Sequence, residues 1–310
     1  IWDQSALSLA ALDVTGTLTL DSEGAPGIGQ SGAWTGNILR VTTYGGIPIA
    51  LGAPFTSTFN FVSLRTLNAL GTADAAGAID YRSSAGFEIE GNGLRTTATA
   101  TIVAGGALVD TGPTVTGTLD LDLGGANVTL DDAAVNIGTL TTSGGNIGTG
   151  NITETGGMDL DGVTATSLTL TTDNAVSDTA ANDINTLTVA AGAGSDVLLN
   201  AANDFDTFAA TSGNNVTVND TDALAIGTST VTATVRGPIA WAGPTVCPKW
   251  PPAGTTAVPT LTATTSSTAA TGVWTPTATA TVCLVAAPRT RVWAKIATTR
   301  PPTSGRVPLN

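Results

Sequence analysis

Hydrophobic residues along the chain alternate with small polar residues in short runs, which is the period of a β-strand. Leu12–Leu20 (LDVTGTLTL) shows this pattern first, and from Val115 onward it recurs at short intervals. Gly, Asn and Asp separate the runs, as tight turns require. No stretch shows a sustained helical period. The pattern therefore predicts an all-β protein with many short strands.

The pattern also repeats itself. TGTLTL at residues 15–20 returns as TGTLDL at 116–121 and as INTLTV at 184–189. Gly124–Leu140 (GGANVTLDDAAVNIGTL) returns 68 residues later as Gly192–Phe208 (GAGSDVLLNAANDFDTF), with one residue of slippage. Self-similarity at a fixed period marks a stacked repeat architecture. An antiparallel sandwich also has many short strands, but it lacks this repetition.

These observations predict a right-handed parallel β-helix, most regular over residues 115–235. We expect the 68-residue period to hold three coils of roughly 22 residues, and the rod to have ~10 coils and a length of about 50 Å. The richest apolar stretch, Phe55–Leu70, is the expected source of an irregular protrusion. The residues expected to point inward are Leu119, Leu121, Leu130, Leu187, Val189, Leu198 and Val216.

Composition divides the chain near residue 237. Residues 1–237 hold all 24 acidic residues and 5 Arg, for a formal charge of −19, whereas residues 238–310 hold 6 Lys or Arg and no acid, for +6. Both cysteines, Cys247 and Cys283, lie in the second segment. We expect a β-helical repeat region at 1–237 and a basic Pro/Thr/Ala-rich tail at 238–310.

The tail has two interpretations. It is either a Pro- and Thr-rich linker or the product of a frameshift in a GC-rich coding sequence. Both predict a segment without its own core, in which Trp241, Trp250, Trp274 and Trp293 are exposed and Cys247 and Cys283 need not pair. Because the chain begins with Ile1 and shows no signal sequence, we also expect it to be an internal fragment of a longer protein.

The chain contains no histidine, which removes the commonest general base and metal ligand. A Ser–His–Asp triad and a His-based zinc site are therefore excluded. A pI near 4.1 argues against nucleic acid as a partner. No apolar run is long enough to span a membrane. We expect no enzymatic activity and no cofactor.

One segment approaches a calcium-binding pattern. Ala191–Leu199 (AGAGSDVLL) resembles the nonapeptide of calcium-binding β-rolls, with Asp196 as the carboxylate ligand. Calcium needs six to eight oxygens, so such nonapeptides must stack in consecutive copies. Only one copy is present, and its first glycine is replaced by Ala191. The sequence therefore favours an ordinary turn here, with Asp196 as the one candidate for calcium.

Paired carboxylates offer the alternative of glycoside hydrolysis, at Asp131–Asp132 and Asp220–Asp222. However, Asp131 aligns with Asn200 of the neighbouring repeat, which favours a role in a turn. Three convergent carboxylates, or carboxylates beside an arginine, on one face would favour a carbohydrate-active enzyme. A smooth Thr/Asn face would favour a structural rod. The basic residues that precede Arg236 are Arg40, Arg65, Arg82 and Arg95.

The asparagines allow two further interpretations. Asn127, Asn151 and Asn215 begin N-glycosylation sequons, which an Asn/Thr-rich repeat also produces by chance. Asn200 and Asn203 are candidates for a ladder of stacked amides at the turns.

Three phrases carry a family resemblance: Gly27–Ala33 (GIGQSGA), Ser195–Phe205 (SDVLLNAANDF) and Thr211–Gly227 (TSGNNVTVNDTDALAIG). They resemble the passenger repeats of filamentous-haemagglutinin-like exoproteins and large bacterial adhesins, over roughly residues 5–235. The resemblance implies a secreted, surface-displayed β-helical shaft from a Gram-negative bacterium. Its expected partners are a host cell or matrix surface, glycan or protein, and other segments of the same long exoprotein. The expected location is extracellular or at the bacterial cell surface.

Overall fold

The computed structural model describes residues 1–3, 7–52, 54, 56–229, 233–236 and 239–240. All the regular elements in this part of the chain are β-strands, and the strands stack as a solenoid of about ten turns. The predictions for the tail, which concern its lack of a core, its tryptophans and its cysteines, fall outside the described residues.

Every pairing between named strands is parallel, and the strands form two ladders. The first ladder contains β1 Trp2–Asp3, β3 Leu12–Ser22, β5 Trp34–Thr43, β8 Phe61–Thr66, β10 Phe87–Arg95, β12 Leu108–Asp110, β14 Val128–Leu130, β16 Ile147–Glu154, β18 Thr164–Thr172, β20 Asp183–Ala190, β22 Thr207–Ser212, β24 Leu224–Ile226 and β26 Ile239–Ala240. The second contains β2 Leu7–Leu9, β4 Ile28–Gln30, β6 Ile49–Leu51, β9 Ile79–Ser83, β11 Thr99–Ala104, β13 Thr114–Asp122, β15 Asn136–Thr141, β17 Met158–Asp161, β19 Val176–Asp178, β21 Val197–Asn203, β23 Val216–Asp220 and β25 Ala233–Arg236. The short strand β7 Ser57–Thr58 pairs with β5 and β9.

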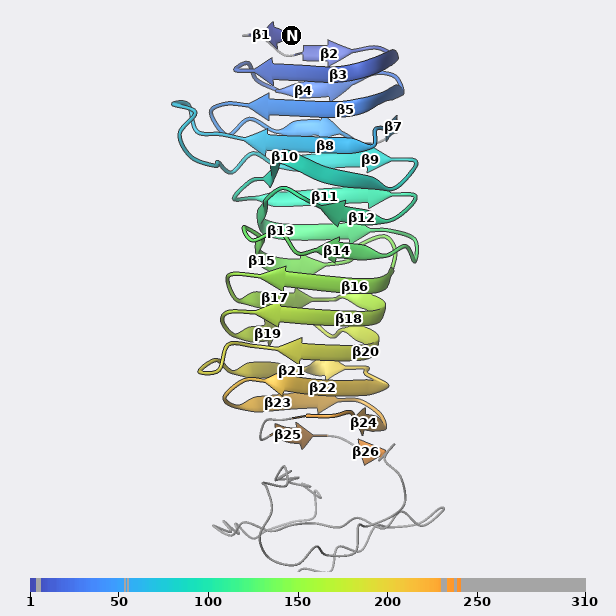
Figure 1. Ribbon diagram of the computed structural model, residues 1–310, viewed down its shortest axis with the longest axis vertical. Helices are drawn as coiled ribbons and strands as arrows, with labels where there is room; N and C mark the ends of the chain where they lie inside the picture. The colour runs from blue at the N-terminus through green and yellow to red at the C-terminus, as the bar shows by residue number, and fades with distance from the viewer. Residues whose placement is uncertain (4–6, 53, 55, 230–232, 237–238, 241–310) are drawn as a thin grey trace, which may run out of the picture.

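The chain alternates between the ladders, so one strand of each ladder makes one coil (Figure 1). With the N-terminus at the top of Figure 1, the near strands β3, β16 and β18 run to the left as the chain descends. The coils are therefore right-handed, as connections between parallel strands generally are. This confirms the predicted right-handed parallel β-helix.

Apolar side chains from successive coils stack in register inside the rod. Leu168 of β18 pairs with Leu187 of β20, which pairs with Phe208 of β22, and all three are fully buried. The same column contains Gly150, where a Cβ would lie 2.6 Å from Leu168 Cδ1. Glycine thus leaves room for the leucine of the next coil. Each fully buried leucine contributes about 1.5–3 kcal/mol.

The predicted inward set is right except at one position. Leu119, Leu121, Leu130, Leu187, Val189 and Val216 are buried, whereas the side chain of Leu198 is 38% exposed. Val197 and Leu199 on either side of it are buried instead. Because side chains alternate along a strand, the choice of Leu198 over its neighbours was one residue out of phase.

The prediction that 68 residues make three coils is wrong. The echoed segments lie seven strands apart: β12 corresponds to β19, β13 to β20 and β14 to β21. Seven strands are three and a half coils, so each echo moves a segment from one ladder to the other. Both ladders bury one side of each strand against the same core, so the same strand sequence suits either of them.

Candidate functional site

A hairpin interrupts the regular coils between β8 and β9. It comprises residues 67–78 and extends from the side of the rod as the cyan loop in Figure 1. The predicted protrusion at Phe55–Leu70 overlaps it only at residues 67–70, since the preceding residues include β7 and β8. Residues 61–66 join the first ladder because their inward side chains continue its core columns, as Val62 and Leu64 show.

The tip of this hairpin is internally hydrogen bonded. Leu67 and Asp74 form an antiparallel bridge, and the Asn68 N–H donates to the Ala73 carbonyl. The Asn68 side chain accepts the Thr72 N–H, and Gly71 closes the turn at a φ of 70°, a conformation that glycine adopts without strain. At the tip, Leu70 is 83% exposed, the most exposed large hydrophobic residue of the described chain.

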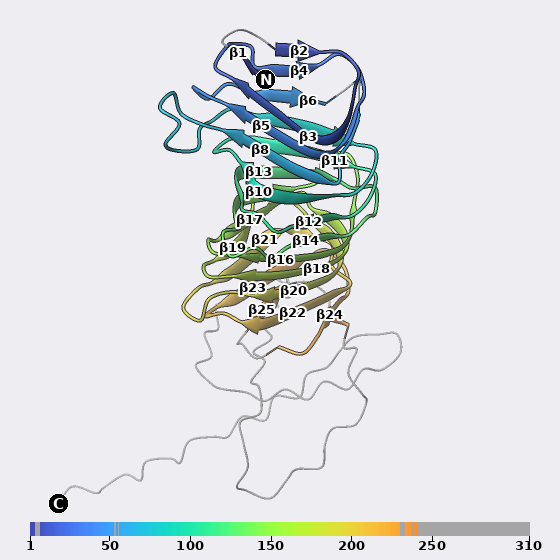
Figure 2. The same cartoon turned by 45° about the horizontal axis from the view of Figure 1, so that its top comes forward.

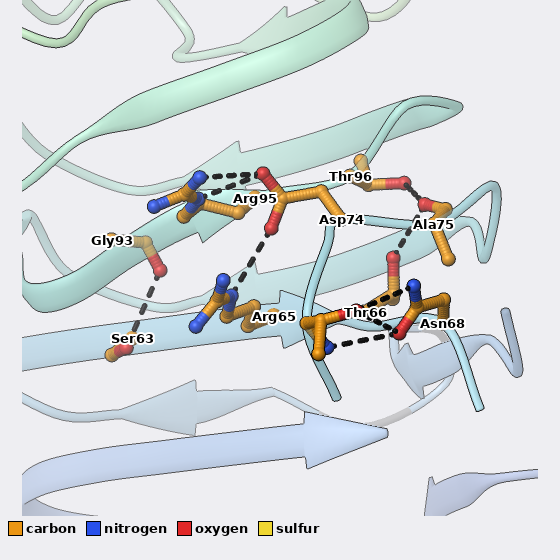
Figure 3. Close-up of polar contacts among 10 residues, drawn as sticks. Ser63, Arg65, Thr66, Asn68, Asp74, Ala75, Gly93, Arg95 and Thr96 are labelled. Carbon is orange, nitrogen blue, oxygen red and sulfur yellow. Dashed lines mark hydrogen bonds and ion pairs between the residues drawn. The ribbon is translucent and has the colours of Figure 1, made fainter. Parts of the chain in front are cut away.

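Two arginines on adjacent coils hold the base of the hairpin (Figure 3). Arg65 of β8 and Arg95 of β10 are register partners, so their positive charges stack at strand spacing. Asp74 lies between them. Its Oδ1 accepts from Arg65 Nε at 3.1 Å, and its Oδ2 accepts from Arg95 Nη2 at 2.7 Å. Only 10% of the Asp74 side chain is exposed, so these ion pairs are shielded from solvent.

Threonine hydroxyls fix the returning segment of the hairpin. Thr66 and Thr96 both donate to the Ala75 carbonyl, and Thr96 also donates to the Gly77 carbonyl at 2.6 Å. The hairpin is therefore tied at its base to the coils on both sides of it, as Figures 2 and 3 show. A contact element that is ordered before binding loses less entropy on association.

The fold brings together charges that are distant in sequence. Arg40 of β5 pairs with Glu90 of β10 at 2.8 Å, across the coil that contains β8. Arg82 lies beside Asp80, where burial raises the pKa of the carboxyl and the Arg82 charge opposes that rise. Three arginines are thus paired with acids that no sequence spacing revealed, because the pairing follows from the coil length.

A second set of carboxylates points into the corners of the rod. Asp110 accepts the N–H groups of Asp131 and Asp132, and Asp178 accepts those of Asn200 and Ala201. This confirms that Asp131 and Asn200 are equivalent turn positions: each donates its N–H to an inward aspartate of the preceding coil. These inward aspartates were missed because their sequence context resembles that of any surface turn.

Glu154 and Asp220 cap corners in the same way. Glu154 accepts the Ile137 N–H at 3.2 Å, and Asp220 accepts the Phe205 N–H at 2.9 Å. Burial raises the pKa of both carboxyls, and these hydrogen bonds partly offset the rise. Asp220 is therefore a buried cap, whereas Asp222 is exposed. The pair that sequence suggested for catalysis does not share one environment.

The predicted amide ladder exists, but with a different membership. Asn203 is buried and its Oδ1 accepts both the backbone N–H and the side-chain amide of Asn182. Asn182 in turn accepts the Val163 N–H at 2.8 Å. Asn200 faces solvent and is not part of this ladder.

Asp196, the calcium candidate, uses its carboxylate to cap a turn. Its Oδ1 accepts the Asn215 N–H and the side-chain amides of Asn214 and Asn215. These bonds, the backbone N–H first, lower the pKa of Asp196. Calcium at this oxygen would displace three N–H donors, so the residues here do not fit the ion. Within the described ranges, no three Asp, Glu, Cys or His side chains are placed to hold a metal.

One corner gathers exposed acids. Asp183 and Asp204 form a parallel bridge on adjacent coils, and Asp206 and Asp222 lie close enough to act on Asp204. Partial desolvation, followed by repulsion from Asp222, Asp183 and Asp206, raises the pKa of Asp204. By contrast, the outward residues along β16, β18 and β20 are uncharged from Thr149 to Thr153, Ser167 to Thr171 and Thr186 to Ala190.

The three sequon asparagines, Asn127, Asn151 and Asn215, are all exposed. No helix in the part of the chain described by the structure is long and apolar enough to cross a membrane.

The geometry defines a β-solenoid repeat protein with one projecting hairpin. In the comparisons with known proteins, a family model described as "Repeats of unknown function (DUF5649)" matches residues 1–62 and 144–212, together under half of the chain. No curated protein and no solved structure matches. The two matched segments lie on either side of the hairpin, which is therefore outside the part of the chain similar to that family.

Proposed function

We propose that this chain is a non-catalytic shaft of a secreted, surface-displayed bacterial adhesin or haemagglutinin-like exoprotein. The shaft provides reach, and the hairpin of residues 67–78 provides the contact for adhesion. The partner is a host cell or matrix surface, and the shaft works as one segment of a longer exoprotein. The observation that carries this proposal is a preorganised apolar tip on an otherwise regular rod.

The structure of the hairpin supports a contact role. Leu70 is exposed although its neighbours at the base are tied down by Asp74 and two arginines. Exposed apolar side chains on ordered loops are common features of binding surfaces, since scaffolds position functional loops. The repeats on both sides match a repeat family with no assigned function, so the proposal rests on the hairpin.

The test is adhesion by the full chain to surfaces coated with decellularised extracellular matrix or with mixed glycans. Leu70→Ser removes the apolar tip, and Leu198→Ser is the matched control, because Leu198 is partly exposed on the side of the rod. We expect the first variant to lose adhesion at least tenfold and the second to retain it. Equal adhesion by both variants would exclude the hairpin as the contact, and no adhesion by the wild-type chain would exclude the function.

The acidic corner favours a second candidate, a carbohydrate-active β-helix enzyme. Four coupled aspartates, Asp183, Asp204, Asp206 and Asp222, meet the criterion of convergent carboxylates on one face. A glycosidase needs one acid that remains protonated and one that stays ionised. Release of reducing sugars from a panel of polysaccharides by the wild-type chain, abolished by Asp204→Asn, would establish this alternative.

A further inference from the structure

We propose that Asp110 is a pH-sensitive joint in the rod: as a neutral acid it holds the corner at residues 131–135 closed, and its ionisation loosens that corner. The proposal concerns the shaft itself and does not depend on what the hairpin binds.

The two oxygens of Asp110 have unequal environments. Oδ1 accepts the N–H groups of Asp131 at 2.8 Å and Asp132 at 3.3 Å. Oδ2 is buried and has no hydrogen-bond partner among the described residues. The whole residue is only 6% exposed and stands in an inward position, next to the buried Ile89 of β10. An ionised carboxylate here would leave charge on an unsatisfied buried oxygen, which is costly.

The repeat supplies an internal control. Asp178 stands 68 residues further on and accepts the equivalent turn N–H groups of Asn200 and Ala201. Its Oδ2 also receives the Asn203 side-chain amide at 2.7 Å. The residue 68 positions before Asn203 is Val135, which is buried and has no side-chain donor. One asparagine-to-valine difference between the repeats thus accounts for the unsatisfied oxygen of Asp110.

The charges around Asp110 all oppose its ionisation. Asp131 and Asp132 face it from the turn after β14. On β10, Glu88 and Glu90 flank Ile89, and Glu90 is paired with Arg40, so no unpaired cation lies there. Burial first, and then repulsion from Asp131 and Asp132, raises the pKa of Asp110 to about 6 against the hydrogen bonds from the same two residues.

The sign of the effect follows from linkage. The folded chain holds the Asp110 proton more tightly than the unfolded chain, in which the pKa is near the ordinary 3.8. The stabilisation is therefore complete below about pH 3.8 and is lost as the pH rises through about 6. Glu154 and Asp220 each have one buried, unsatisfied oxygen as well, so their corners are expected to respond in the same direction.

Amide hydrogen exchange of the full chain, followed by mass spectrometry between pH 4.5 and 7.5, tests the joint. Rates are corrected with unstructured peptides for the intrinsic effect of pH. We expect protection of residues 131–135 to fall at least tenfold around pH 6, while protection of residues 200–203 stays constant. A change of equal size in both corners would show global loosening and overturn the proposal, as would constant protection in both.

Two variants separate the charge from the fold. Asp110→Asn retains an acceptor for the Asp131 and Asp132 N–H groups and cannot ionise, so residues 131–135 should stay protected across the range. Val135→Asn introduces the amide that Asp178 receives from Asn203 and should lower the transition by at least one pH unit. If either folded variant keeps the wild-type transition at pH 6, Asp110 is not its source.

Discussion

Replacing Leu187 by alanine removes a leucine that packs between Leu168 and Phe208 of the adjacent coils. The side chain is fully buried, and coils above and below hold its neighbours at fixed strand spacing, so the site has little freedom to collapse. Leucine-to-alanine substitutions at such sites cost roughly 3–5 kcal/mol. For a folded region of this size, 1 kcal/mol lowers Tm by about 2–4 °C, so we expect a decrease of about 6–20 °C.

The matched control is Leu198→Ala. Leu198 belongs to the same rod but is 38% exposed, so the loss should stay below about 1 kcal/mol. Both variants are melted under identical conditions and followed by circular dichroism, with scan rates varied because solenoids need not unfold in one step. Equal shifts for the two variants, or a larger shift for Leu198→Ala, would refute the assignment of inward and outward positions.

Three further predictions concern the hairpin, the turns and the ladder. Arg95→Ala should raise hydrogen exchange in residues 67–78 at least tenfold while Tm changes by less than about 4 °C, because it removes one of the two cations on Asp74. Gly93→Ala should cost well over 1 kcal/mol in denaturant unfolding, since its φ is 83° and a Cβ would lie 1.8 Å from the Pro113 carbonyl; Gly162→Ala, at a φ of 67° with open space, should cost only about 1 kcal/mol. Asn203→Ala should cost about 1–3 kcal/mol because the Asn182 N–H loses its acceptor, and Asn200→Ala should stay within about 0.5 kcal/mol.

The periodic pattern was sufficient to predict the parallel β-helix, because each coil repeats the same demand: apolar residues inward and Gly, Asn or Asp at the corners. It could not assign the coil length. The same strand sequence serves either ladder, so a period of three and a half coils is indistinguishable from three. Leu198 shows a related difficulty, since three consecutive apolar residues, Val197 to Leu199, leave the phase of the strand open.

The candidate site was only partly predictable. The apolar stretch pointed to a protrusion near residue 70, but the clamp on Asp74 depends on Arg65 and Arg95 being exactly one coil apart. That register requires the coil lengths around the hairpin. The inward aspartates were hidden for the same reason, because Asp110 and its N–H donors are separated by 21 and 22 residues.

The stacking of coils in register is tested most directly by spin-label distances. Val109, Thr129, Asn151, Thr169, Thr188 and Ala209 occupy one outward column on successive coils. Cysteine is introduced at Val109 and, in turn, at Thr169, Thr188 or Ala209, in a chain whose Cys247 and Cys283 are replaced by serine. At about 4.8 Å per coil, we expect backbone separations of about 14, 19 and 24 Å, which rise by a constant step. Distances that do not increase by one strand spacing per coil would contradict the parallel solenoid.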